Sequence, residues 1–197
     1  MTLVLGRETS PGGSHEDFFR RCFLRNEGIP VLEYLGRKYG PQAAASAQSG
    51  KGPLSQMAEK MGLKFNYDRM IVNTLKSHCL LDYAKSVGKQ NEMAEILFND
   101  YFRHAKRIDQ SAVLKEAAEA CHIDWSAADT HMNNAEIVSR VKREAGTASA
   151  SGINGVPHFN IFLKSNQARS QQFSGAQPAA TILSVFQKVL SFAKSRV

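Results

Sequence analysis

Three cysteines, Cys22, Cys79 and Cys121, are the side chains of this sequence best suited to redox chemistry. Thiol–disulfide exchange needs one thiolate near neutral pH and a second thiol close enough to complete a disulfide. No two of the three cysteines are neighbours in the sequence, so the chain contains no CxxC motif. No cysteine or histidine cluster has the spacing of a structural zinc site, and we expect no metal site. The spacing alone therefore identifies no catalytic pair.

The three cysteines differ in their surroundings. Cys79 and Cys121 each fall on the apolar stripe of a predicted helix, which indicates buried core thiols. Cys22 falls in a predicted strand close to three arginines, and nearby positive charge lowers the pKa of a thiol. Cys22 is therefore the best candidate for a reactive thiol, and an inert strand residue is the alternative.

The elements that would position these residues follow from hydrophobic periodicity. A strand is predicted over residues 18–24, and the small, polar residues 43–52 predict a flexible link. The predicted helices before residue 150 span residues 31–39, 54–61, 75–87, 90–104, 112–121 and about 126–145. The pattern then changes to a strand over 159–163, a turn, a second strand over 169–173 and a final helix. This order of elements predicts an α/β fold that carries a helical block.

The net charge of +7 is concentrated near the C-terminus, where residues 151–197 carry five basic and no acidic side chains. This excess could attract a small anion or an acidic partner, and a plain basic solvated surface is the alternative. The chain has no contiguous basic run and no aromatic residues interleaved with lysine and arginine. Nucleic acid is therefore not an expected partner.

The composition predicts a soluble globular protein. Hydrophobic residues make up 43% of the chain, which is enough for a packed core. No apolar run reaches the roughly 18 residues of a membrane span, so no membrane contact is expected. The first residues do not read as a secretory signal, because Arg7 and Glu8 directly follow a short apolar patch. We expect a cytoplasmic location, with a mitochondrial one as the alternative.

Five segments together resemble one protein family. They read EGIPVLEYLGRKYG (27–40), NTLKSHCLLDYA (73–84), EMAEILFNDYFRHAKRID (92–109), SGINGVPHFNIF (151–162) and FSGAQP (173–178). They are similar to segments of DsbA-like thioredoxin-fold proteins of the FrnE type. The wider group includes kappa-class glutathione transferases and 2-hydroxychromene-2-carboxylate isomerases. The most specific part of the resemblance is Gly-Val-Pro followed by Ser-Gly-Ala-Gln-Pro about twenty residues later.

The resemblance implies an α/β, thioredoxin-like fold with an inserted helical domain. Residues 1–52 would form a partial N-terminal half of the thioredoxin fold, residues 53–150 the helical insertion and residues 151–197 the C-terminal half. Family members have a strand, a CxxC and a long helix before the segment that corresponds to residue 18. Here seventeen residues without cysteine precede it, so we expect this strand–helix unit to be incomplete. Residues 1–5 could substitute in part, the chain could be an incomplete or alternative product, or a partner could fill the gap.

The resemblance also implies a substrate site around Pro157. The Val156–Pro157 bond would be cis, so that the backbone of Val156 pairs with an extended peptide or with glutathione. A plain tight turn is the alternative. His158 stands where the family has an apolar residue, and it would be either a hydrogen-bond donor beside a bound anion or merely a partly exposed side chain.

Further site residues are implied by the turn near the C-terminus and by the helical block. In the glutathione-using relatives the turn that matches Ser174, Gly175 and Gln177 holds the γ-glutamyl end of glutathione, because a helix N-terminus attracts carboxylates. Capping of the final helix by Ser174 is the alternative. Asn73 and His78 match family positions that face the cleft, and a helix cap and a structural histidine are the alternatives.

The function that the resemblance implies is thiol–disulfide exchange through a mixed disulfide. We expect this activity to be weak or absent here, because the CxxC motif is missing. The alternatives are a glutathione-dependent transferase or isomerase of the kappa type and a non-catalytic peptide-binding protein. The expected partner is a thiol or disulfide peptide or glutathione, and no cofactor is expected beyond glutathione as a co-substrate. Homo-oligomerisation is left open.

Overall fold

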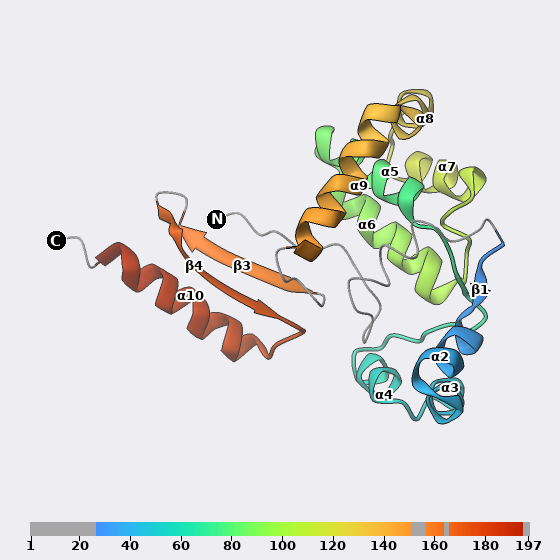
Figure 1. Ribbon diagram of the computed structural model, residues 1–197, viewed down its shortest axis with the longest axis horizontal. Coiled ribbons are helices and arrows are strands. Elements are labelled where there is room, and N and C mark those ends of the chain that lie inside the picture. Colours follow the sequence, from blue (N-terminus) through green and yellow to red (C-terminus); the bar gives the residue numbers. More distant parts are fainter. Residues whose placement is uncertain (1–26, 151–156, 164–165, 195–197) are drawn as a thin grey trace. The chain divides into compact units, whose positions relative to one another are not determined.

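The computed structural model of the chain describes residues 27–150, 157–163 and 166–194 (Figure 1). These residues divide into two compact units, which meet in sequence between Gly146 and Thr147, within one long helix. The strand predicted around Cys22 lies outside the described residues. The three-part division of the domains stays a prediction.

A short antiparallel strand pair lies near the start of the first unit. Strand β1 (Ile29–Pro30) pairs with β2 (Met70–Ile71), with Ile29 opposite Ile71. Gly28 precedes β1 with φ of 73°, and a Cβ atom added to it would lie 3.2 Å from the carbonyl oxygen of Ile71. Only glycine suits both the left-handed backbone and the close approach.

Proline marks the start of three helices in this unit. Helix α2 (Val31–Tyr39) directly follows a proline, and α3 (Pro41–Gln48) and α4 (Pro53–Lys60) begin with one. Proline suits this position because the first N–H groups of a helix have no partner within it. Helices α2 and α4 confirm the predicted helices. The flexible link predicted over residues 43–52 is wrong for most of its length, because α3 contains four alanines, the strongest helix formers.

A helical block follows β2. Its elements are α5 (Leu75–Ser86), α6 (Gln90–Phe98), the π-helical turn η1 (Asn99–Arg103), α7 (Ser111–Ala120), α8 (Trp125–Asn133) and α9 (Ala135–Ala150). The single helix predicted over residues 126–145 is therefore two helices. Asn134 separates them because its backbone is extended and its side-chain oxygen accepts the N–H groups of Glu136 and Ile137, which begins a new helix.

The core of the first unit lies among these helices. Five of its larger side chains have a relative exposure of 0%: Cys79, Leu80, Met93, Leu114 and Cys121. Alanines that are equally buried separate them and let the helices approach closely. Full burial of one large apolar side chain stabilises a fold by about 1.5–3 kcal/mol, so this cluster is the main source of stability in the unit.

A buried arginine lies between the short strands and η1. Arg69 is 4% exposed, its Nη1 donates to the carbonyl oxygen of Asn66 at 2.7 Å, and its own carbonyl oxygen accepts the N–H of Val31 at 3.0 Å. Its guanidinium carbon lies 5.0–5.9 Å from the ring centres of Phe65, Tyr67, Tyr101 and Phe102. The aromatic rings offset part of the cost of burying this charge.

The second unit is a β-hairpin covered by a helix. Strand β3 (His158–Leu163) pairs antiparallel with β4 (Asn166–Ser174), and α10 (Ala179–Lys194) packs against both strands (Figure 1). The rings of Phe159 and Phe173, opposite each other in the register, stack with their centres 4.8 Å apart. Ile161 of β3 and Val189 of α10 are buried. The predicted strand–strand–helix order is confirmed.

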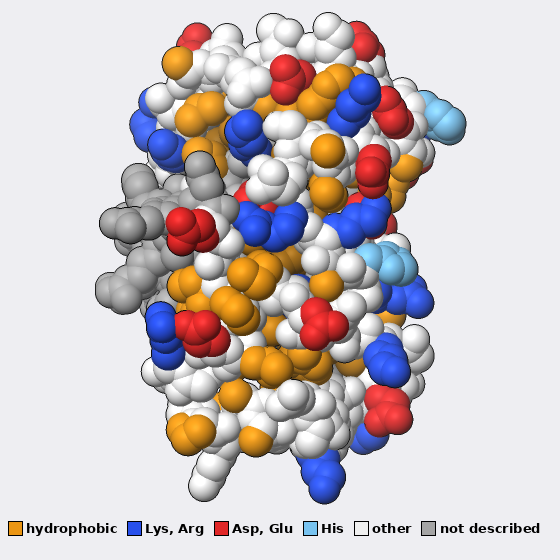
Figure 2. Space-filling view, turned by 90° about the vertical axis from the view of Figure 1, so that its right-hand side faces the viewer, with side chains coloured by type: hydrophobic (Ala, Val, Ile, Leu, Met, Phe, Trp, Pro, Cys, Tyr) orange, Lys and Arg blue, Asp and Glu red, His pale blue; other side chains and the backbone are white. Residues whose placement is uncertain are grey.

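The surface carries both signs of charge and several exposed apolar side chains. On the face shown in Figure 2, basic and acidic side chains are interspersed with small hydrophobic areas. Leu183 and Leu190 of α10 are more than half exposed, at 58% and 55%. None of the described helices has the length and apolar composition needed to cross a membrane.

Candidate functional site

The end of the β3–β4 hairpin brings together four residues expected at the substrate site. His158 and Ser174 are opposite each other in the register, and His158 Nδ1 lies 2.8 Å from Ser174 Oγ, within hydrogen-bond distance. The N–H of Gly175 donates to the carbonyl oxygen of Pro157 at 2.8 Å, which closes the end of the hairpin. The φ angle of Gly175 is 87°, a conformation that favours glycine. We define these residues, Pro157, His158, Ser174 and Gly175, as the hairpin end.

Gln177 lies beside the hairpin end. Its Nε2 is 3.9 Å from the position that a Cβ atom on Gly175 would occupy, so the amide folds back over the turn. Helix α10 begins at Ala179, and the carbonyl oxygen of Pro178 accepts the N–H groups of Thr181 and Ile182. The hydroxyl of Ser174 is paired with His158, and its role as a cap of this helix stays a prediction.

The other expected site residues have different placements. Asn73 and His78 lie at the start of α5 in the first unit. The side-chain oxygen of Asn73 accepts the N–H of Leu75, the first residue of α5, at 3.0 Å, and His78 is 7% exposed. Val156 and Cys22 lie outside the described residues, so the cis peptide bond and the reactivity of Cys22 stay predictions.

Cys79 and Cys121 are not joined in a disulfide, and neither has exposed surface. Burial raises the pKa of the Cys121 thiol, the nearby Glu92 raises it further, and Lys89 offsets only part of this effect. A raised pKa and a buried sulfur both oppose thiolate chemistry. The interpretation of these two cysteines as core residues is confirmed.

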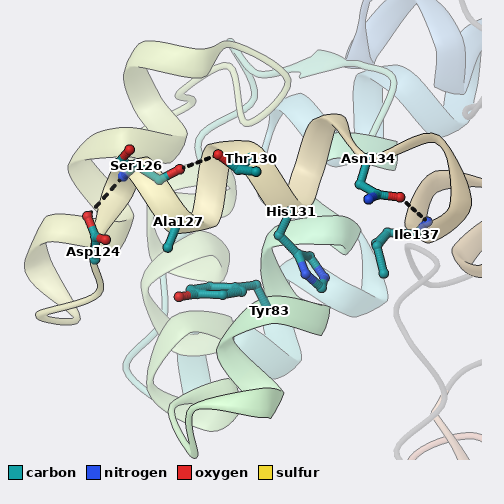
Figure 3. Close-up of a pocket in the computed structure, with 8 residues that line it drawn as sticks. All are labelled: Tyr83, Asp124, Ser126, Ala127, Thr130, His131, Asn134 and Ile137. Carbon is teal, nitrogen blue, oxygen red and sulfur yellow. Dashed lines mark hydrogen bonds between the residues drawn. The ribbon is translucent and has the colours of Figure 1, made fainter.

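A shallow pocket with a volume of about 510 Å³ lies between α5, α8 and α9 (Figure 3). The residues that line it are Tyr83, Asp124, Ser126, Ala127, Thr130, His131, Asn134 and Ile137. Figure 3 shows the ring of Tyr83 below α8, with the rest of the lining coming from α8 and the start of α9. The sequence analysis did not identify this pocket.

The buried carboxylate of Asp82 contacts His131, one of the residues that line the pocket. Asp82 accepts hydrogen bonds from both Nη atoms of Arg140, at 2.6 and 3.1 Å, and its Oδ2 lies 2.9 Å from His131 Nε2. Burial raises the pKa of Asp82, but the hydrogen bonds and charges of Arg140 and His131 outweigh it and hold the pKa below its ordinary value. This network ties α5 to α8 and α9 and fixes the ring of His131.

No sequence signal pointed to this network, because its members are 49 and 58 residues apart along the chain. A polar Asp82 within an otherwise buried helix segment is the one observation that could have suggested a buried partner. No group of three or more His, Cys, Asp or Glu side chains that could share a metal ion occurs in the described part of the chain.

Comparison with family models decides the assignment of the chain. The model of the DSBA-like thioredoxin domain matches residues 35–187. The chain belongs to this family. The match includes the helical block and the hairpin end, so the family-level resemblance and the α/β thioredoxin-like fold with a helical insertion are confirmed.

A solved structure shares this DSBA-like fold. It is described as a probable DsbA oxidoreductase from Streptomyces coelicolor, and it matches with a TM-score of 0.70 and 23% sequence identity. The match covers 84% of this chain and 69% of the other. A search of curated proteins found no match. The FrnE branch and the link to glutathione enzymes stay predictions.

Proposed function

We propose that this DSBA-like protein binds a thiol- or disulfide-containing peptide at the hairpin end. The observation that carries the proposal is the joint placement of the four hairpin-end residues, with the His158–Ser174 pair beside the Pro157–Gly175 backbone bond. The segment Val156–Pro157 would pair with the extended backbone of the peptide, and His158 and Ser174 would bind polar groups next to its sulfur. The roles of Asn73 and His78, which lie in the first unit, stay predictions from the family resemblance.

The thiol–disulfide exchange activity of the chain would be weaker than that of relatives with a CxxC. Exchange requires an exposed thiolate and a second thiol within reach. Cys79 and Cys121 are buried, and Cys22 is separated from both by more than fifty residues of sequence. A peptide bound at the hairpin end would therefore meet at most one reactive thiol of this chain, that of Cys22.

Two assays test this proposal. An extended peptide with a mixed disulfide is titrated against the chain and against Pro157→Ala, and we expect binding that the substitution abolishes. An insulin-reduction assay compares the chain with a DSBA-like relative that has a CxxC, and we expect a much lower rate. A rate equal to that of the relative, or peptide binding unchanged in Pro157→Ala, would contradict the proposal.

Glutathione binding is the second candidate function, and the same hydrogen-bonded pair favours it. Ser174 and His158 can offer donors to a carboxylate, and residues 151–197 contain no acidic side chain that would repel one. Glutathione would then be a co-substrate of a kappa-type transferase or isomerase. Calorimetry at millimolar glutathione tests this, and an absence of heat would reject it. The cytoplasmic location and homo-oligomerisation stay predictions that cell fractionation and light scattering can test.

A further inference from the structure

The pocket between α5, α8 and α9 is separate from the site of the proposed function. All of its lining residues belong to the first unit, whereas the hairpin end belongs to the second. Tyr83 comes from α5, Asn134 and Ile137 from the start of α9, and the others from α8 and its cap (Figure 3). None of these residues belongs to the hairpin end, and their chemistry indicates which ligand the pocket suits.

The charge of the pocket is negative. Asp124 is the charged carboxylate in the lining, which contains no lysine or arginine. Its Oδ1 accepts the N–H of Ser126 at 3.0 Å, and Oδ2 is left for a ligand. Arg140 lies close in sequence, but its guanidinium is engaged by Asp82 and Glu144. Asp124 also neutralises the positive end of α8, so a cation is favoured over an anion.

Some polar groups of the lining can accept hydrogen bonds from a ligand, whereas Asn134, whose Oδ1 accepts the N–H groups of Glu136 and Ile137, keeps its amide donor. The hydroxyl of Thr130 donates its proton to the carbonyl oxygen of Ser126 at 2.9 Å, so its oxygen can only accept from a ligand. His131 binds Asp82 through Nε2, and Nδ1 is the ring nitrogen left over. A ligand with several N–H donors therefore suits the acceptors at Asp124 and Thr130.

The aromatic part of the pocket adds a flat surface. The ring of Tyr83 lies 5.2 Å from that of His131 with an angle of 54° between the planes, and the bond to Asp82 fixes the histidine. A flat cation gains most from an aromatic face. The guanidinium of arginine is planar and has five donors in its plane, so it suits a lining that offers an aromatic face and a carboxylate, and it has a flat face that an ammonium group lacks.

We propose that this pocket binds an arginine side chain presented by a polypeptide partner. The pocket is shallow and open, so it covers one side chain while the backbone that carries the arginine stays outside. Residues of the helical insertion thus select a protein partner by a basic residue, independently of any thiol. Trp125, the single tryptophan of the chain, lies between Asp124 and Ser126 and reports on the site.

The test is a fluorescence titration of Trp125 in the whole chain. The probes are three capped pentapeptides at low ionic strength, Gly-Gly-Arg-Gly-Gly and its glutamine and glutamate counterparts, with free arginine as a fourth ligand. We expect a saturable change with the arginine peptide, at least about five-fold tighter binding than with the glutamine peptide, and none with the glutamate peptide. Added salt should reduce this preference, because it screens the exposed carboxylate.

Matched variants separate the pocket from general effects. Asp124→Asn keeps a good helix cap and removes the charge, so the arginine peptide should bind no better than the glutamine peptide. Asp129→Asn makes the same charge change on α8 outside the pocket, and the preference should remain. Tyr83→Leu should weaken binding of the arginine peptide, and thermal unfolding confirms that each variant is folded.

Several results would overturn the proposal. They are equal binding of the arginine and glutamine peptides, tighter binding of the glutamate peptide, and a preference that survives in Asp124→Asn. The absence of a saturable change with any peptide would overturn it as well. Tighter binding of free arginine than of the arginine peptide would show a small-molecule site and reject the polypeptide partner.

Discussion

The hairpin end and the Asp82 network behind the pocket are both built on a histidine held by an oxygen, but their surroundings differ. At the hairpin end, Ser174 is exposed and its bond to His158 lies at the surface. In the helical block, Asp82 is 9% exposed and binds His131 and Arg140 at once. A surface pair can be changed with little effect on folding, whereas removal of a buried carboxylate leaves its partners without a counter-charge. The first region is therefore suited to a variable binding function, and the second is a fixed support for the pocket.

The largest predicted effect comes from removing the buried carboxylate. Asp82→Ala should lower the free energy of unfolding of the helical block by about 2–3 kcal/mol, because Arg140 and His131 lose a shared partner. Urea unfolding followed by Trp125 fluorescence measures this change in the unit that contains the network. Asp129→Ala, a more exposed change on α8, should cost about 0.5 kcal/mol or less. Equal costs for the two variants would show that the network does not stabilise the block.

The same comparison has a pH dependence with a definite sign. The folded-state pKa of Asp82 is below its ordinary value, so its contribution is present above the unfolded pKa of about 3.9 and is lost as pH falls through the folded pKa. The difference in unfolding free energy between the wild-type chain and Asp82→Ala should therefore be constant from about pH 7 to 5 and shrink below about pH 4. Urea titrations of both proteins across this range measure it. A difference that grows on acidification would contradict the assigned charge state.

A smaller effect is predicted at the backbone of the hairpin end. Gly175→Ala should cost about 1–2 kcal/mol, because φ is 87° there and an L-residue is strained in this conformation. Hydrogen exchange at the Gly175–Pro157 backbone bond measures this local loss. The matched control is Gly36→Ala within α2, where the nearest described neighbour of the added Cβ, the Cβ of Ala44, is at an ordinary contact distance of 3.8 Å. That variant should gain about 0.5–1 kcal/mol, and the same sign in both variants would disprove the backbone argument.

The smallest effect is predicted for the surface hydrogen bond. Ser174→Ala should lower the stability of the hairpin by about 0.5–1 kcal/mol and leave the helical block unchanged. The nitrogen chemical shift of His158 Nδ1 should move, because its partner 2.8 Å away is removed. Ser184→Ala on α10 is a control that removes an exposed hydroxyl bound only to its own helix. If Trp125 fluorescence reported a loss of stability in Ser174→Ala, the two regions would not be independent.

Local signals of the sequence predicted much of the fold. Apolar periodicity and proline placement correctly predicted α2, α4, α5 and the strand–strand–helix order near the C-terminus. The stripe positions of Cys79 and Cys121 predicted their burial. These signals succeed because each lies within a few residues of the element that it specifies. His158 and Ser174 lie directly beside the strands predicted over 159–163 and 169–173, and the strands in the structure extend far enough to include them.

The features that sequence reasoning missed depend on competing local choices or on distant contacts. Asn134 interrupts the helix predicted over residues 126–145 because its side chain caps the next helix, a choice that apolar periodicity does not record. The region of α3 was predicted to be a flexible link because its alanines and polar residues form no apolar stripe. The pocket depends on α5 meeting α8, which only the packing of the core brings about.

The four aromatic rings around the Arg69 guanidinium have a consequence for local unfolding of the first unit. Its carbonyl oxygen holds the N–H of Val31 at the start of α2, while the nearby Asn66 N–H is held by the carbonyl oxygen of Phe102 in η1. Two of the aromatic rings around the guanidinium precede β2 (Phe65 and Tyr67), and the other two belong to η1 (Tyr101 and Phe102). Separating the strand pair from η1 would expose a charged group and four rings together. The amide protons of Val31 and Asn66 lie in different segments. They should nevertheless exchange with solvent through the same cooperative opening and show the same free energy of opening.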